Sequence, residues 1–345
     1  FGQAFAHFMI GDYDEGMKLM MEAEPAIVDI ALPNWDGKTD PNLHVVACGE
    51  YGFGDIMQFI RYVRALQSRV GKVTLSIPYH LLRLIHFNFP EFPLHVYQVP
   101  DHEKASLPKN ASEQVPRDAR AKCFYMDLPH LLGPFDALSE CVPYLKADPK
   151  LVPFWKEKLA SIPHPRIGLA WSGNPLNQNN HNRSIPFDEL KPLINLAGPH
   201  LISLQRGDEQ KLIKNTGVFD ASPYIKDFAD TAAALEEIDL LITVCSAPTC
   251  LAGAMGKPTW TLLAFNPDWR WLIEREDSIW FPKTRLFRCQ KPKDWAGTIE
   301  KTCAELKQYL EGNGSVLFPP KFMGQNKRQH PNALILSNFE SKIIE

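Results

Sequence analysis

Gly49-Glu50-Tyr51-Gly52-Phe53-Gly54-Asp55 is the stretch of sequence that best indicates the fold. The apolar run 45–48 precedes it, and apolar residues at helical spacing follow it from Ile56 to Val63. We therefore expect a strand, a tight glycine turn and a helix. Open α/β sheets bind ligands at such turns, because glycines let a ligand approach the backbone and a helix start offers free N–H groups. Asp55 either caps this helix or takes a proton from a substrate.

The alternation of strands and helices continues on both sides of a boundary near residues 148–165. Strands are predicted at 45–48, 73–77, 94–97 and 123–126 before the boundary, and at 166–171, 201–204, 240–244, 259–263 and 286–288 after it. Helices are predicted at 81–87, 154–159, 187–194, 231–237, 248–255 and 295–310. Such alternation is typical of doubly wound parallel sheets. The sequence therefore predicts an α/β fold with two Rossmann-like domains.

The expected domain organisation has four parts. A helical repeat-like segment covers residues 1–31, an N-terminal Rossmann-like domain 32–155, a C-terminal Rossmann-like domain 156–311 and a tail 312–345. The first part resembles the last unit of a tetratricopeptide-type repeat, which needs a neighbour to bury its apolar face. An ordinary N-terminal hairpin is the alternative. The chain begins at Phe1, which leaves room for a missing upstream segment.

The composition excludes several classes of function. Of the 345 residues, 45% are hydrophobic and 22% charged, as in soluble globular proteins, and the net charge of −3 does not favour nucleic acid as a partner. No apolar run approaches the roughly 20 residues that cross a bilayer, and the first residues do not read as a secretory signal. The seven cysteines form no Cys-x-x-Cys pair. We therefore expect a cytoplasmic protein without a structural metal.

Polar side chains gather in four loops that follow predicted strands of the second half. Because the carboxyl ends of parallel strands share one edge of a sheet, these loops are candidates for a ligand site. The loops are 171–175 with the polar stretch 177–183, then 205–207, 227–231 and 245–250. In the last of them Ser246 suits a helix N-cap, so its hydroxyl and the free N–H groups suit a phosphate. Cys245 as a nucleophile is disfavoured, since no histidine lies near it in sequence.

The glycine pattern argues against a nicotinamide cofactor. Gly49-x-x-Gly52-x-Gly54 does not have the G-x-G-x-x-G order of the dinucleotide fingerprint, and no clear ribose-binding acid ends the second strand. A P-loop lysine is absent as well. Two Rossmann-like halves without this fingerprint suggest a cleft between domains.

Several motifs in register resemble one family over residues 33–310. The motifs are Trp35-Asp36-Gly37, Gly52-x-Gly54-Asp55-x-x-Gln58-Phe59-x-Arg61-Tyr62, Gly168-Leu169-x-Trp171-x-Gly173-Asn174-Pro175, Arg183-Ser184-Ile185-Pro186, Asp227-Phe228-x-Asp230-Thr231-Ala232, Ala252-Gly253-Ala254-x-Gly256-Lys257-Pro258 and Pro267-Asp268-Trp269-Arg270-Trp271. The chain resembles the bacterial tetratricopeptide-repeat-linked glycosyltransferases. These are related to the heptosyltransferases of glycosyltransferase family 9 and distantly to O-linked N-acetylglucosamine transferases.

The resemblance implies a GT-B fold and a metal-independent transfer of a sugar from a nucleotide-diphosphate donor. It implies no cofactor beyond that donor, and the acceptor could be a glycan, a protein or a small molecule. In such enzymes the aspartate of the glycine turn is the general base, which falls on Asp55. Acceptor-side positions would be Gly52, Gly54 and Gln58. Donor contacts would fall on Trp171, Ser172, Gly173, Asn174, Arg183, Gln205, Arg206, Asp230, Thr231, Ser246, Ala247 and Thr249.

One departure from the family pattern keeps a second hypothesis open. Relatives commonly carry Asp-Thr-Ala followed by histidine, where this chain has Cys245-Ser246-Ala247 followed by Cys250. The hydroxyl is kept, but the acid and the imidazole are not. A GT-B-fold binding or scaffold protein without catalysis is therefore the alternative to a transferase.

Overall fold

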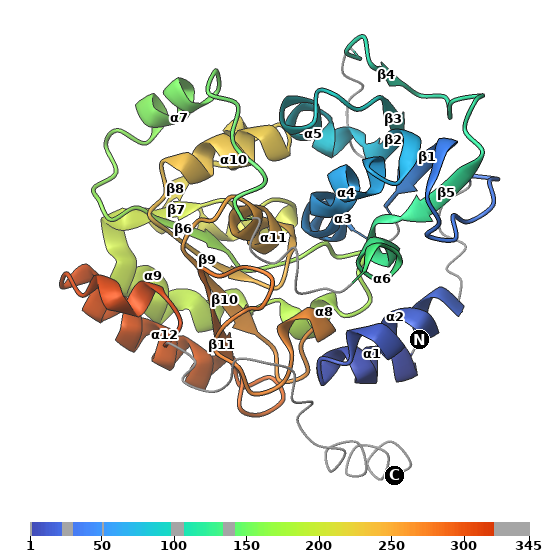
Figure 1. The fold of residues 1–345 in the computed structure, drawn as a ribbon. Helices are drawn as coiled ribbons and strands as arrows, with labels where there is room; N and C mark the ends of the chain where they lie inside the picture. Colours follow the sequence, from blue (N-terminus) through green and yellow to red (C-terminus); the bar gives the residue numbers. More distant parts are fainter. Residues whose placement is uncertain (1, 23–29, 50–51, 98–106, 134–141, 321–345) are drawn as a thin grey trace.

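The computed structural model describes residues 2–22, 30–49, 52–97, 107–133 and 142–320. Two α/β domains lie side by side, with the first half of the chain in blue to green and the second in green to red (Figure 1). Every pairing between neighbouring strands of the two sheets is parallel in the described residues. The predicted α/β class with two Rossmann-like domains is therefore confirmed. The expected domain limits stay predictions.

The first domain contains a five-stranded sheet of order β4-β3-β2-β1-β5. The last five residues of strand β1, 44–48, are all buried, as expected for a parallel strand covered on both faces. Cys48 at the end of β1 lies beside Phe124 of β5, where the strand order reverses. The elements are β1 (Asp40–Cys48), α3 (Phe53–Phe59), α4 (Val63–Gln67), β2 (Val70–Pro78), α5 (Leu82–Asn88), β3 (Leu94–Tyr97), β4 (Ala111–Ser112), β5 (Ala121–Phe124), η3 (Tyr125–Asp127) and α6 (Leu128–Leu132).

The second domain contains a six-stranded sheet of order β11-β10-β9-β6-β7-β8. Renumbered within the domain, this is the Rossmann order 3-2-1-4-5-6, and its switch point falls between β6 and β9. Ligands bind such sheets outside the carboxyl ends of the strands at that point. The elements are α7 (Val152–Lys158), β6 (Ile167–Ala170), α8 (Asn180–Arg183), α9 (Lys191–Ala197), β7 (Leu201–Ser203), β8 (Phe219–Asp220), α10 (Phe228–Glu236), β9 (Leu240–Val244), α11 (Ala247–Ala254), β10 (Thr259–Leu263), η10 (Trp269–Trp271), β11 (Thr284–Arg288) and α12 (Trp295–Leu310).

Most predicted strands and helices coincide with these elements, and the differences have local causes. β4 and β8 are two-residue edge strands, too short to show an alternating pattern. The polar stretch 177–183 was expected to be a loop, but its end forms the one-turn helix α8. Residues 321–345 of the expected tail lie outside the described residues. No helix in the described ranges is long and apolar enough to span a bilayer.

The N-terminal segment is a helical hairpin of α1 (Gly2–Met9) and α2 (Tyr13–Glu22). Gly16 allows the two helices to approach closely, because a Cβ at this position would lie 2.5 Å from the Phe8 ring. Phe8 is fully buried and lies against Trp269 of the second domain, with the ring centroids 4.5 Å apart. The hairpin thus packs on the body of the protein, and its relation to tetratricopeptide repeats stays a prediction.

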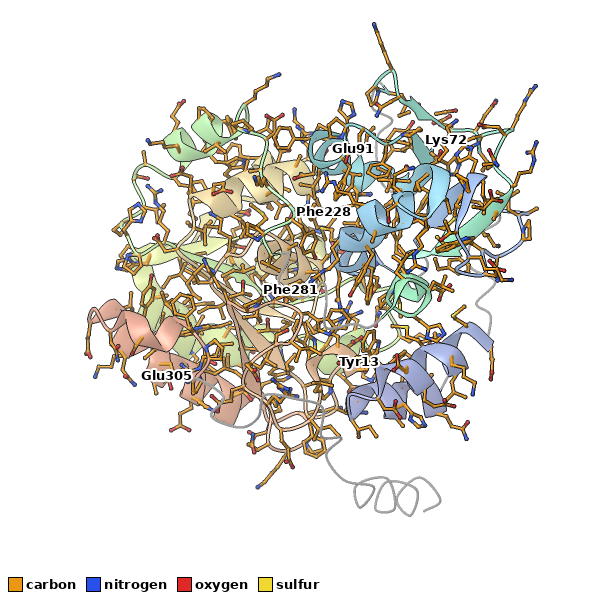
Figure 2. All side chains as sticks on the ribbon, in the orientation of Figure 1. Tyr13, Lys72, Glu91, Phe228, Phe281 and Glu305 are labelled. Carbon is orange, nitrogen blue, oxygen red and sulfur yellow. The ribbon has the colours of Figure 1, made fainter. Side chains whose placement is uncertain are left out.

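The two domains contact each other through helices α3 and α11 (Figure 1). Gly54 eases the contact, since a Cβ there would lie tightly against Cys250 Sγ at 3.2 Å and in ordinary contact with Ala247 Cα at 3.6 Å. A single apolar cluster continues from the first sheet into α10 and α11. Figure 2 shows Phe228 at this junction, where its ring lies 5.4 Å from that of Phe53. The domain junction is therefore closed and largely apolar.

Candidate active site

Asp55 lies at the junction between the domains and makes two polar contacts. Its Oδ2 accepts a hydrogen bond of 2.9 Å from the backbone N–H of Gly52, the N-cap residue of α3. Its Oδ1 accepts a hydrogen bond from Nη2 of Arg270, which belongs to η10 of the second domain. The side chain is only 17% exposed. Both roles considered for Asp55 therefore remain compatible with its position: it caps the helix, and its carboxylate faces the other domain.

The electrostatic environment of Asp55 is mixed. Burial raises the pKa of Asp55 above its ordinary value, and the charge of Asp268 adds to the rise. The Arg270 guanidinium and the Gly52 N–H oppose it. A carboxyl group whose pKa lies above the usual range for aspartate is better suited to accept a proton near neutral pH.

Arg270 is the centre of a small ionic cluster. Its Nη1 lies 3.0 Å from Asp268 Oδ2, and its guanidinium lies over the Trp269 ring at 5.3 Å from the centroid. Burial alone would lower the pKa of Arg270, but Asp268 and Asp55 raise it. The side chain is 10% exposed, and its buried Nε has no hydrogen-bond partner in the described part of the chain. One guanidinium is thus shared between two carboxylates.

The start of α11 lies next to this cluster, at the carboxyl end of β9. Ser246 is the N-cap residue, as predicted, and Pro248 occupies the first turn. The hydroxyl of Ser246 donates to the Val244 carbonyl at 3.2 Å, and that of Thr249 to the same oxygen at 2.9 Å. Ser246 and Ala247 are partly exposed, whereas Thr249 is fully buried. The Thr249 hydroxyl therefore supports the turn.

Arg183 connects two of the predicted loops across the switch point. Its Nη1 donates to the Cys245 carbonyl at 3.1 Å, and its Nε donates to Asn180 Oδ1 at 3.2 Å. Gly173 lies directly under the guanidinium, since a Cβ there would be 2.4 Å from Arg183 Nη2. Arg183 forms no ion pair with any described residue. A cation without an acidic partner therefore flanks the start of α11.

The remaining polar residues after β6 and β7 bond mainly to their own domain. Gln205 Oε1 accepts hydrogen bonds of 2.9 Å from the backbone N–H groups of Trp171 and Ser172. Nη1 of Arg206 donates to the carbonyls of Ser222, at 3.0 Å, and Ile225. These bonds hold the loops together, and the Trp171 ring is buried with them. Asn174 closes its own loop by accepting the Leu176 N–H at 3.0 Å.

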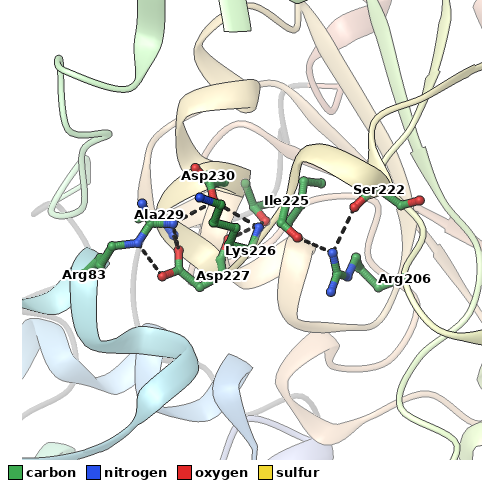
Figure 3. A network of polar contacts seen from close by, with 9 residues as sticks. Arg83, Arg206, Ser222, Ile225, Lys226, Asp227, Ala229 and Asp230 are labelled. Carbon is green, nitrogen blue, oxygen red and sulfur yellow. Dashed lines mark hydrogen bonds and ion pairs between the residues drawn. The ribbon is translucent and has the colours of Figure 1, made fainter. Parts of the chain in front are cut away.

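Asp230 takes part in a second ionic contact between the domains (Figure 3). Arg83 of α5 forms two bonds with Asp227, Nε–Oδ2 at 2.6 Å and Nη2–Oδ1 at 2.8 Å, and its Nη2 also contacts Asp230 Oδ2 at 2.6 Å. Asp227 caps α10 by accepting the Ala229 N–H at 2.8 Å. The N-cap of α10 is therefore Asp227, whereas Asp230 lies in the first turn of the helix. Thr231 donates to the Asp227 carbonyl at 3.3 Å.

Two buried thiols and one buried amide lie near the domain junction. The thiols of Cys245 and Cys250 are buried, and burial raises the pKa of Cys250 to about 12 and that of Cys245 above its ordinary value. Both are therefore protonated near neutral pH, which argues against a thiolate nucleophile. Gln58 is fully buried, and neither atom of its amide has a partner in the described ranges.

The structure thus gathers part of the predicted site. The glycine turn with Asp55 contacts the start of α11, and Arg183 joins the β6 and β9 loops. Sequence reasoning missed the pairing partners Arg83 and Arg270, because these contacts link residues 144 and 215 positions apart. The mixture of charged and aromatic residues around Arg270 was the signal in the sequence that could have pointed to this contact. No group of three or more His, Cys, Asp or Glu in the described residues could hold a metal ion.

Two facing Rossmann-like domains with their carboxyl strand ends at a common junction define the GT-B fold. The solved structures of similar fold include the two that follow. One is the glycosyl transferase family 9 protein from Veillonella parvula, with a TM-score of 0.54 and 12% identity, covering 81% of this chain and 98% of that chain. The other is ADP-heptose lps heptosyltransferase II from E. coli, with a TM-score of 0.52 and 13% identity, covering 80% and 98%. At these identities the likeness shows the fold alone.

A curated relative resembles the chain in sequence. Protein FlbA of Caulobacter vibrioides is 25% identical over 288 residues, which are 80% of this chain and 48% of FlbA. The chain therefore spans about half the length of this relative. No family model matches the sequence.

Proposed function

We propose that this chain is a glycosyltransferase that moves a sugar from a nucleotide-diphosphate donor to an acceptor hydroxyl without a metal ion. The single observation that carries the proposal is the contact between the domains. Within a GT-B fold, the carboxylate of the first domain's glycine turn lies beside the helix that begins at the second domain's switch point. The glycosyltransferase neighbours in the fold comparison support the same reaction class.

The donor is assigned to the second domain. Its diphosphate would lie at the start of α11, where the helix dipole and Arg183 favour negative charge. Arg183 suits this role because its charge is not neutralised by an acidic side chain in the described residues. The β6 loop around Gly173 and Asn174 would then contact the rest of the nucleotide sugar.

The acceptor is assigned to the first domain. Asp55 removes the proton of the acceptor hydroxyl while the oxygen attacks the anomeric carbon of the sugar. The bond from that carbon to the diphosphate oxygen breaks, and the nucleoside diphosphate leaves with the bonding electrons. Arg183 offsets the charge that develops on it, an electrostatic contribution that is often the largest in catalysis.

A panel of ligands tests this proposal. Thermal unfolding is measured with uridine, guanosine, adenosine and cytidine nucleotides, their sugar conjugates and NAD. Stabilisation by a nucleoside diphosphate, together with release of that nucleotide from its sugar conjugate, supports a transferase. Stabilisation by NAD alone would overturn it in favour of an oxidoreductase.

A binding or scaffold protein without catalysis is the second candidate. The observation that favours it is the pair of buried cysteines at 245 and 250, where relatives commonly carry an acid and an imidazole. This candidate predicts no nucleotide release from any conjugate in the panel. Nucleotide binding without turnover, under conditions in which a family 9 transferase is active, would therefore favour the scaffold.

A further inference from the structure

We propose that Arg270 is a positioning residue for the general base: from the second domain it orients the Asp55 carboxylate and holds it in its charged form. This inference rests on the proposed function, because a base is needed only if the chain transfers a group. The contact joins the two domains, so the base is fully arranged only when they close.

The geometry distinguishes Arg270 from an ordinary surface ion-pair partner. Asp55 Oδ2 is occupied by the Gly52 N–H, so Arg270 governs the remaining oxygen, Oδ1. The guanidinium cannot turn away freely, because Asp268 binds Nη1 and the Trp269 ring lies against it. Trp269 is in turn packed by Phe8 of the N-terminal hairpin. A chain of contacts thus runs from the hairpin to the carboxylate.

Few charged groups lie around Asp55 among the described residues, so the effect of Arg270 on the pKa of Asp55 can be measured separately. The groups that face Asp55 are Arg270 of η10, the η10 N-cap residue Asp268 and Cys250 of α11. Cys250 is a neutral thiol near pH 7, since its pKa is raised to about 12 by burial. Asp127 of η3 also lies on an element that packs on α3, but it does not shift the pKa of Asp55. Arg270 is therefore the cation that opposes the protonation of Asp55.

The test measures the pKa of Asp55 by carbon-13 NMR of aspartate-labelled protein, with the signal assigned through Asp55→Asn. Arg270→Gln should raise this pKa by about 1–3 pH units, the usual effect of losing an adjacent opposite charge. Arg270→Lys should largely restore it, since the positive charge is kept. Asp268→Asn should lower it, because this variant removes the carboxylate charge that raises the pKa and leaves the guanidinium to Asp55 alone. Arg270→Met, which keeps the apolar stem of the side chain without its charge, gives a second test should Arg270→Gln fail to fold.

Arg83→Gln is the matched control, because among the described residues it removes the other guanidinium that forms ion pairs between the domains, and Arg83 does not contact Asp55. It should leave the pKa of Asp55 unchanged. If Arg270→Gln leaves that pKa unchanged in folded protein, or if Arg83→Gln shifts it equally, Arg270 only docks the domains and the inference is overturned.

The catalytic consequence is read from the pH dependence of nucleotide release. The acid limb of the profile should move upward in Arg270→Gln by the same 1–3 pH units. An acid limb that stays in place while the pKa of Asp55 moves would contradict a role in catalysis. If the wild-type protein releases no nucleotide from any donor, the proposed function fails, whereas the NMR titration still decides whether Arg270 controls Asp55.

Discussion

Two arginines of the described residues form ion pairs between the domains, and they do so in opposite ways. Arg83 reaches from the first domain to Asp227 and Asp230 of the second, and its side chain is 38% exposed. Arg270 reaches from the second domain to Asp55 of the first, and its side chain is 10% exposed. Each guanidinium is shared between two carboxylates. The half-exposed guanidinium of the Arg83 cluster (Arg83, Asp227 and Asp230) is partly screened by water, so we expect this cluster to act as a fastening. In the proposed mechanism, the buried Arg270 cluster controls the charge of Asp55.

The largest expected effect concerns the carboxylate of the buried cluster. Asp55→Asn should lower turnover by about 10²–10⁴-fold, the usual contribution of a general base, while nucleotide affinity stays nearly unchanged. Steady-state release of nucleotide and calorimetric binding measure the two quantities. Full activity in the variant would reduce Asp55 to a helix cap.

The Arg83 cluster should affect the free energy of unfolding more than the rate of sugar transfer. Arg83→Gln leaves two buried carboxylates without their cation and should lower the free energy of unfolding by about 1–3 kcal/mol, after allowance for the exposure of Arg83. Denaturant unfolding measures this change. Arg64→Gln is the control, since it breaks the exposed pair with Glu91 and should cost under about 0.5 kcal/mol. Equal losses in both variants would show that the Arg83 cluster does not fasten the domains.

Asp127 shows how burial changes the pKa of a carboxyl group that has no guanidinium partner in the described residues. Asp127 forms no ion pair with a described residue, and burial raises its pKa to about 7, although the backbone N–H of Phe124 opposes the rise. Because this pKa lies above that of the unfolded chain, the protonated form stabilises the fold, and this stability is lost as the pH rises from about 4 through 7.

Asp127→Asn removes the carboxyl group whose ionisation destabilises the fold as the pH rises. At pH 8 the variant should be more stable than the wild type by on the order of 2 kcal/mol, and near pH 4 the two should be equal. Thermal unfolding across this pH range measures the difference. A gain that does not depend on pH would point to a packing effect instead.

The smallest expected effect is that of salt. Raising the ionic strength from about 0.1 M to about 1 M shortens the Debye length from about 10 Å to about 3 Å. The wild type should then lose a few tenths of a kcal/mol more stability than Arg83→Gln, since the variant lacks the half-exposed guanidinium of the Arg83 cluster. The difference in unfolding free energy between the two proteins at each salt concentration measures it. An unchanged difference would mean that the cluster is not screened.

The sequence predicted the sheets well but not the contacts between them. Local periodicity identifies a strand such as β9 or a helix such as α12, because the signal lies within one segment. It also placed Asp55 and Ser246 at helix starts. It could not show that Asp230 would face Arg83, since the two residues lie 147 positions apart and on different domains. Nor could composition show that Gln205 and Arg206 would bond to backbone groups of their own domain.

The contact between Phe8 and Trp269 has a practical consequence for the design of N-terminal truncations. Trp269 and Trp280 are 2% and 1% exposed, and Phe8 and Tyr13 of the N-terminal hairpin lie against them. A fragment starting near residue 32 would leave these aromatic rings facing solvent, and large bare apolar patches promote aggregation. The two short helices therefore belong in any preparation that is meant to stay in solution.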